Sequence, residues 1–174
     1  MLKRITAAVG LGLVVLACAN DGRSDAKGTA EANESREIES LVAAYEMVRH
    51  QLANDKAEGL TAAFDQLKTA AAEAAGQSAS VAVAQDLKTL SEAAERGAEV
   101  ADSDLQGARK AFAEASSHLV GAISAEPRLA HGLLVFECPM VEHYPKWVQA
   151  SEPKANPYMG KEMQTCGVAS AWVD

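Results

Sequence analysis

Apolar residues recur with helical spacing in four consecutive blocks between residues 34 and 125. In each block they fall three or four positions apart, which is typical of an amphipathic α-helix. The expected inward-facing positions are Ile38, Leu41, Val42, Tyr45, Val48 and Leu52; Leu60, Phe64, Leu67, Ala71 and Ala74; Val83, Leu87, Leu90, Ala94 and Gly97; and Leu105, Ala108, Phe112, Ser116, Leu119 and Ile123. Because no proline interrupts the region and the breaks are short, neighbouring helices should run antiparallel. The pattern predicts an up-down four-helix bundle.

Small polar residues, glycine and proline indicate where these helices begin and end. Asp55 and Glu58 have the spacing of a capping box, which would start the second helix at Asp55. Gly76 is expected to cap the C-terminal end of that helix. The remaining expected boundaries are Asn54, Ser78 or Ser80, Asp102-Ser103 and Pro127.

The chain changes character after residue 126, where all five prolines and both tryptophans lie. Leu133-Leu134-Val135-Phe136 is too short for a helix of the earlier type and is expected to be extended. Glu152-Pro153 and Asn156-Pro157 indicate turns. We therefore expect a mainly α protein whose residues 126–174 form an irregular, Pro- and aromatic-rich segment with one or two short strands. Aromatic packing, a disulfide or a metal ion would have to order it.

The first 17 residues have the pattern of an export signal. Lys3 and Arg4 form a short positive region, and residues 5–17 are apolar except for Thr6. Such a stretch is too short to span a bilayer comfortably, which indicates a signal peptide rather than a transmembrane helix.

Cys18 follows Val15-Leu16-Ala17, which resembles a bacterial lipobox, whose cysteine is lipidated and becomes the new N-terminus. Ala19 then follows, a pattern that resembles lipoproteins sent to the outer membrane. An ordinary cleaved signal beside a chance cysteine is the alternative. Residues 18–33 lack large apolar side chains and are expected to form a flexible tether between a membrane anchor and a folded domain at 34–174.

The formal net charge of the chain is −8, and no basic run occurs in it. A nucleic-acid-binding protein needs a basic surface, so nucleic acid is not an expected partner. Cations suit an acidic surface better, although acidity by itself mainly favours solubility.

Sulfur is concentrated in the last quarter of the chain. Cys138 and Cys166 are the cysteines that remain beyond Cys18, and Met140, Met159 and Met163 lie close to them in sequence. Thiolates and thioethers are the soft ligands that select Cu(I) over harder ions. Cys138, Met140, Met163 and Cys166 are therefore the expected ligands of Cu(I) or Ag(I).

The same residues belong to a longer pattern. It consists of Ser116 or Ser117 in a helix, Cys138-Pro139-Met140, Trp147, Asn156-Pro157-Tyr158-Met159-Gly160-Lys161-Glu162-Met163 and Cys166-Gly167. This pattern resembles the DUF3347 family of exported bacterial domains, which also occur appended to adaptor subunits of heavy-metal efflux systems. The resemblance covers about residues 38 to 172 and implies a role near copper or silver handling, with an efflux complex as a possible partner. Met159 departs from the family, which more often has an aromatic residue there.

A structural disulfide between Cys138 and Cys166 is the main alternative to a metal site. An exported protein with two cysteines in its fold meets the conditions for one. Closing a loop of about 28 residues would contribute roughly 3 kcal/mol.

Further side chains are weaker candidates for metal ligands. His143 follows Cys138 by five residues, His118 lies beside the inward stripe of the fourth helix, and Met159 precedes Met163 by four. Zinc is less expected, because no Cys-x-x-Cys pair exists and methionine is a poor zinc ligand. No signature of nucleophilic catalysis or phosphate binding is present, so we do not expect an enzyme.

Overall fold

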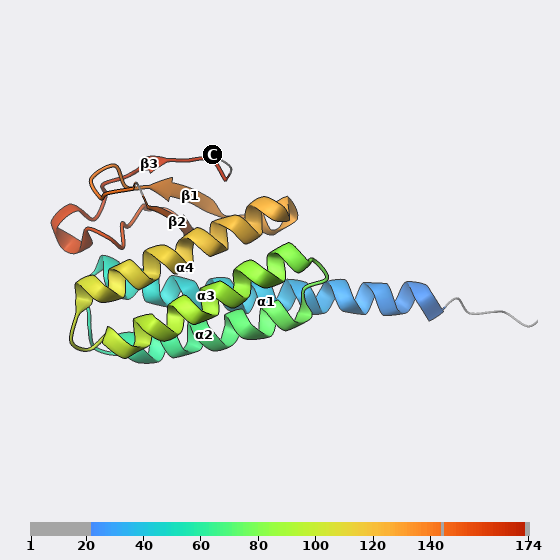
Figure 1. Ribbon diagram of the computed structural model, residues 1–174. Helices are drawn as coiled ribbons and strands as arrows, with labels where there is room; N and C mark the ends of the chain where they lie inside the picture. Colours follow the sequence, from blue (N-terminus) through green and yellow to red (C-terminus); the bar gives the residue numbers. More distant parts are fainter. Residues whose placement is uncertain (1–21, 144, 173–174) are drawn as a thin grey trace, which may run out of the picture.

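The computed structural model describes residues 22–143 and 145–172. Its elements, in chain order, are α1 (Gly22–Ala53), α2 (Leu60–Gln77), α3 (Val81–Val100), α4 (Leu105–Ala125), the 3-10 helix η1 (Pro127–Ala130), β1 (Leu134–Glu137), β2 (Lys146–Gln149), the 3-10 helix η2 (Gly160–Met163) and β3 (Val168–Ala169). Each helix packs on the next in the chain, and Figure 1 shows that their directions alternate. The prediction of a mainly α protein with a four-helix bundle is confirmed.

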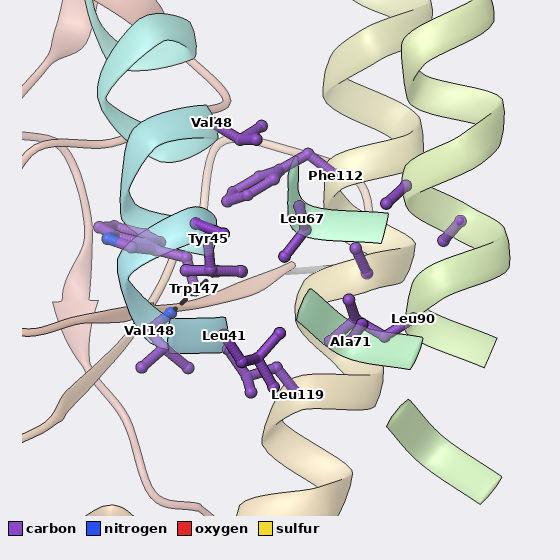
Figure 2. Close-up of a cluster of buried hydrophobic side chains, with 14 of the residues drawn as sticks. Leu41, Tyr45, Val48, Leu67, Ala71, Leu90, Phe112, Leu119, Trp147 and Val148 are labelled. Atoms are coloured by element: carbon purple, nitrogen blue, oxygen red, sulfur yellow. Dashed lines mark hydrogen bonds between the residues drawn. The ribbon is translucent and has the colours of Figure 1, made fainter. Parts of the chain in front are cut away.

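The bundle core is built from the predicted stripes. Leu41, Leu67, Leu90 and Phe112 are all fully buried, and their side chains meet between the helices (Figure 2). Alanine fills many of the remaining inward positions, which allows the helices to approach closely. Gly97 of α3 leaves room for a side chain of α2, because a Cβ there would lie 2.4 Å from the Phe64 ring.

Several helix ends differ from the predictions. The capping box at Asp55 and Glu58 does not form: α2 begins at Leu60 after Gly59, whose φ of 78° starts the helix without a side-chain cap. Asp55 is instead used in an ion pair with Arg109 of α4. Gly76 lies inside α2 rather than capping it.

Other helix ends agree with the predictions, or nearly so. Ser80 caps α3 by accepting a hydrogen bond from the Val83 N–H. Asp104, two residues after the predicted Asp102, caps α4 through the Gly107 N–H. Helix α4 ends at Ala125, before Pro127, as expected.

Helix α1 extends further towards the N-terminus than the bundle pattern predicts. It begins at Gly22, inside the segment 18–33 that was expected to be a tether, and its first turns project beyond the other helices (Figure 1). Alanine and charged residues in this stretch favour helix locally, although no large apolar residue is there to pack. The signal peptide of residues 1–17 and Cys18 lie outside the described residues. Within the described part, no helix combines the length and the apolarity needed to cross a membrane.

The C-terminal segment (residues 126–172) contains a small antiparallel sheet, with strand order β2-β1-β3, that lies against α4. Strand β1 contains most of the predicted extended segment. Phe136 of β1 pairs with Trp147 of β2 and Ala169 of β3. Three strands are thus present where one or two were expected. The third, β3, is two exposed residues with no apolar pattern to reveal it.

Candidate metal site: a neighbouring pair of thiols

Cys138 and Cys166 come together at the end of the sheet. Cys138 directly follows β1 and is fully buried, and its N–H donates to Pro145 O at 3.1 Å, which closes the loop between β1 and β2. Cys166 lies just before β3, is half-buried, and its N–H donates to Met163 O at 2.9 Å. Both cysteines are free thiols, and their side chains are close enough to interact directly.

Asn156 joins the two cysteines. Its Nδ2 donates to Cys138 Sγ at 3.1 Å and to Cys166 O at 2.9 Å. Its Oδ1 accepts from the N–H of Tyr158 at 2.7 Å and of Met159 at 3.2 Å. The side chain is completely buried, and these four bonds use its full hydrogen-bonding capacity. In the sequence Asn156 indicated a turn and belonged to the longer pattern, but neither predicted its bonds to the two cysteines.

An aromatic cluster lies beside the thiol pair. Trp147 is fully buried and packs on Phe136, with ring centroids 5.3 Å apart, and on Tyr158 at 6.0 Å. Gly167 leaves room for this indole, because a Cβ there would lie 2.4 Å from it. The tryptophan thus packs against the chain directly after Cys166.

A buried network of hydrogen bonds joins the C-terminal segment to the bundle where β2 faces α1 and α4. Tyr45 Oη of α1 is 2.7 Å from Ser116 Oγ of α4 and accepts from the Val148 N–H of β2 at 3.2 Å. Burial raises the pKa of Tyr45 and of Tyr158, so both hydroxyls stay protonated. A tyrosine from the first helix therefore joins three elements that are distant in sequence.

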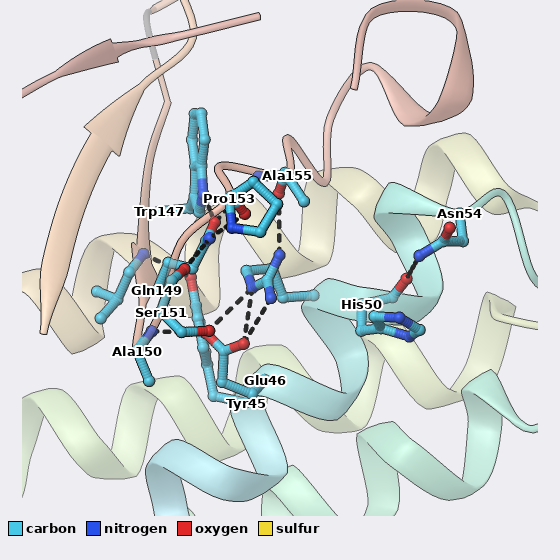
Figure 3. Close-up of polar contacts among 12 residues, drawn as sticks. Tyr45, Glu46, His50, Asn54, Trp147, Gln149, Ala150, Ser151, Pro153 and Ala155 are labelled. Atoms are coloured by element: carbon cyan, nitrogen blue, oxygen red, sulfur yellow. Dashed lines mark hydrogen bonds and ion pairs between the residues drawn. The ribbon is translucent and has the colours of Figure 1, made fainter. Parts of the chain in front are cut away.

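Charged side chains of α1 form hydrogen bonds with the backbone of the loop that leads to Asn156, at Ala150 and Ala155 (Figure 3). Arg49 is buried, pairs with Glu46 and donates to Ala155 O at 3.0 Å. Glu46 in turn accepts from the Ala150 N–H at 3.2 Å. The buried Gln149 bonds the same loop at two further points. Its Nε2 donates to Pro153 O, and its Oε1 accepts from the Ala155 N–H.

Arg109 of α4 holds the other side of the same loop. This buried guanidinium donates to Pro157 O and Leu52 O, at 3.0 Å each, and pairs with Asp55. Asp55 also accepts from the Lys161 N–H at 2.9 Å. The turn that follows α1 is therefore bonded to both ends of the Asn156–Lys161 stretch.

The electrostatics of the pair are set by its surroundings. Desolvation raises the pKa of the Cys166 thiol, the neighbouring Cys138 acts in the same direction, and the Lys154 ammonium offsets part of the effect. Lys154 donates to Gly167 O and lies 5.8 Å above the Phe136 ring. It places a positive charge beside a site that becomes negative when the thiols ionise.

The remaining predicted ligands lie at different depths. Met140 and Met163 flank the thiols in sequence and are exposed, by 61 % and 37 %, whereas Met159 is partly buried against the core. His143 is exposed beside Glu142, and His118 bonds Asp86 of α3 at 3.0 Å. In the described part of the chain, no three His, Cys, Asp or Glu side chains converge as a metal-binding group. The structure thus brings the two cysteines together and leaves both histidines engaged elsewhere.

The residues missed by the sequence analysis are the polar ones that support the pair: Asn156, Arg109, Arg49 and Gln149. Arg109 carries a detectable signal, since it is a charge next to Ala108 on the inward side of α4. Gln149 carries none.

No protein-family model, curated protein or solved structure matches this chain. Fold and site together define the class: a four-helix bundle that supports a C-terminal segment with two neighbouring thiols, one buried and one half-buried.

Proposed function

We propose that this protein is a periplasm-facing lipoprotein that binds a soft monovalent metal ion, Cu(I) or Ag(I), for sequestration or for transfer to an efflux system. The observation that carries the proposal is the pairing of Cys138 with Cys166 around the Asn156 amide. Two cysteines from different parts of the chain are held together by a residue whose amide nitrogen donates to the Cys138 sulfur and to the main-chain carbonyl of Cys166.

The donor set suits a soft ion of low coordination number. Thiolates favour Cu(I), whereas a structural zinc site needs four ligands of the Cys, His or carboxylate type. The described residues offer the two thiols but no cluster of three such groups. A monovalent ion with two thiolates carries a net charge of −1, which the Lys154 ammonium can balance.

Met163 and Met140 supply further sulfur at the outside of the pair. Met163 ends η2, and its carbonyl accepts the Cys166 N–H. Both thioethers are exposed, so they are available to an incoming ion before it reaches the buried Cys138. We assign them a role in capture or hand-over, and Met159, His143 and His118 no role in the metal site.

Export and anchoring are part of the proposal and rest on sequence. The signal-like residues 1–17 and the lipobox-like arrangement at Cys18 support a lipid anchor, and Ala19 supports the outer membrane. The resemblance to the DUF3347 family supports a link to heavy-metal efflux. Incorporation of labelled fatty acid, lost in Cys18→Ser, tests the anchor.

Metal binding is tested by titrating the reduced protein with Cu(I) against a chromogenic chelator. We expect one equivalent to bind, and Cys138→Ser to abolish competition with the chelator. Cys18→Ser changes a cysteine outside the pair, the proposed lipidation site, and is the matched control, with unchanged uptake expected. Full affinity in Cys138→Ser would refute the proposal.

A disulfide-locked structural or interaction protein is the second candidate function. It is favoured by the same closeness of Cys138 and Cys166, because export to an oxidising compartment would allow the two sulfurs to join. Trapping of thiols with an alkylating reagent directly in cells separates the candidates. Two reactive thiols, protected when copper is supplied, support the metal site; two unreactive ones without copper support the disulfide.

A further inference from the structure

Asn156 shapes a turn, and its side chain also donates a hydrogen bond to the Cys138 sulfur. Its orientation is fixed, because Oδ1 accepts two backbone N–H groups, from Tyr158 and Met159. Nδ2 must therefore point the other way, at Cys138 Sγ and Cys166 O. The amide cannot be turned over without placing its N–H groups against two backbone donors.

We propose that Asn156 is the positioning residue that holds the Cys138 sulfur in a metal-ready place beside Cys166 and makes the pair a metal site rather than a disulfide. This inference rests on the proposed function. A hydrogen bond to an ionised acceptor is about twice as strong as one between neutral groups. The Asn156 N–H therefore favours a metal-bound thiolate at Cys138 over a disulfide sulfur.

The need for such a donor follows from the burial of Cys138. The thiol is fully buried between the sheet and the bundle, where an unpaired negative charge is costly. Lys154 lies on the side of Cys166 and Gly167, so its charge serves mainly the other cysteine. Asn156 is the side chain that bonds the Cys138 sulfur directly.

The same contacts couple the two sulfurs in space. One Nδ2 group bonds the side chain of Cys138 and the main chain of Cys166, so the Cys138 sulfur is held in a fixed relation to the backbone that carries the other cysteine. Residues that orient a metal ligand in this way are typically worth 10- to 100-fold in metal affinity.

Two variants separate the donor from the turn. Asn156→Asp keeps an oxygen for the Tyr158 and Met159 N–H groups but replaces the donor by a second oxygen that faces the sulfur. Asn156→Ala removes both functions. Asn54→Ala is the matched control, because Asn54 is also a half-buried, hydrogen-bonded amide on this side of the bundle, bonded to His50 O and Gln164 rather than to a thiol.

The first measurement is the equilibrium between the thiol pair and its disulfide in a glutathione redox buffer, in the Cys18→Ser background. We expect both Asn156 variants to shift this equilibrium about five- to tenfold towards the disulfide, because the hydrogen bond that favours the reduced Cys138 sulfur is lost. Asn54→Ala should leave the equilibrium unchanged. An unchanged equilibrium in both folded Asn156 variants, checked by circular dichroism, overturns the inference.

The second measurement is Cu(I) affinity with both cysteines of the pair present. We expect a fall of about 10- to 100-fold in Asn156→Asp and no change in Asn54→Ala. If the protein with Asn156 binds Cu(I) and both Asn156 variants bind it equally well, the inference fails while the proposed function stands. If the unmodified protein binds no Cu(I), the proposed function fails, and with it the metal-ready role of Asn156.

Discussion

The helical bundle and the C-terminal segment are stabilised in different ways. The bundle is a repetitive apolar core, in which leucine and alanine on one helix meet the same residue types on the next. The C-terminal segment has little regular structure, and polar side chains of the bundle bond its backbone: Arg49 to Ala155 O, Arg109 to Pro157 O and Tyr45 to the Val148 N–H. The bundle therefore tolerates many apolar sequences, whereas the segment depends on particular residues.

The candidate site therefore lies in the C-terminal segment, whose backbone is held in place by side chains of the bundle. Asn156 lies between Ala155 and Pro157, the two residues whose carbonyls the buried arginines hold. The thiol geometry is thus fixed by helices that are far from it in sequence. The following predictions test this division, from the largest expected effect to the smallest.

Loss of one large aromatic side chain in each region should give the largest effects. Phe64→Ala and Trp147→Ala each remove a fully buried ring and should cost about 3–5 kcal/mol of unfolding free energy. Phe64→Ala should raise amide hydrogen exchange throughout the protein. Trp147→Ala should raise it mainly in residues 134–169. Equal acceleration in α2 and α3 by Trp147→Ala would show that the two regions are not distinct.

The two arginine ion pairs should contribute very different amounts to the free energy of unfolding. Arg109→Ala leaves the carbonyls of Leu52 and Pro157 without their donor in a buried position and should cost about 3 kcal/mol. Arg96→Ala is the matched control, since Arg96 pairs with Glu114 on the surface, and it should cost less than about 1 kcal/mol. Urea unfolding measures both. Similar losses would contradict the anchoring role of Arg109.

Two helical glycines should respond oppositely to alanine. At Gly97 a Cβ would collide with the Phe64 ring, so Gly97→Ala should destabilise the bundle by about 1–3 kcal/mol. At Gly76 nothing lies within 4 Å, so Gly76→Ala should stabilise α2 by about 0.5–1 kcal/mol. Thermal unfolding gives the sign. Destabilisation by Gly76→Ala would mean that this glycine ends the helix after all.

The smallest effect should be an acid dependence of the Asp55 contact. Partial burial raises the pKa of the Asp55 carboxyl, but hydrogen bonds from the Lys161 N–H and Arg109 outweigh it, and the pKa lies below its ordinary value. A lowered folded-state pKa gives stability that is complete above the unfolded value, about 4, and is lost as the pH falls through the folded value. Asp55→Asn, which tolerates the same positive φ of 52°, should weaken this dependence. Identical pH profiles of unfolding free energy in both proteins would contradict the assignment.

The sequence was a good guide to the bundle for a physical reason. Helical periodicity records burial directly, and Leu41, Leu67, Leu90 and Leu119 are all buried as their spacing predicts. Helix ends were less predictable, because Asp55 has the chemistry of a cap and yet takes a partner 54 residues away. Local spacing contains no information about such a partner.

The candidate site was predictable only in part. Cysteine chemistry and the turn residues drew attention to Cys138, Cys166 and Asn156-Pro157, and the structure places these side by side. Which donor faces the sulfur, and which cation lies near, depends on the three-dimensional path of a segment with little periodicity. Strand β2 has three consecutive buried residues and no alternation, and β3 is two exposed residues, so neither leaves a period-2 pattern in the sequence.

The most direct test of the central claim is a Cu(I) titration of the reduced protein, in competition with a chromogenic chelator, for the unmodified chain, Cys138→Ser and Cys166→Ser. The account predicts one bound equivalent in the unmodified chain and loss of that capacity in either variant, while circular dichroism shows the bundle intact. Retention of the bound equivalent in both variants would contradict the claim that Cys138 and Cys166 form the metal site.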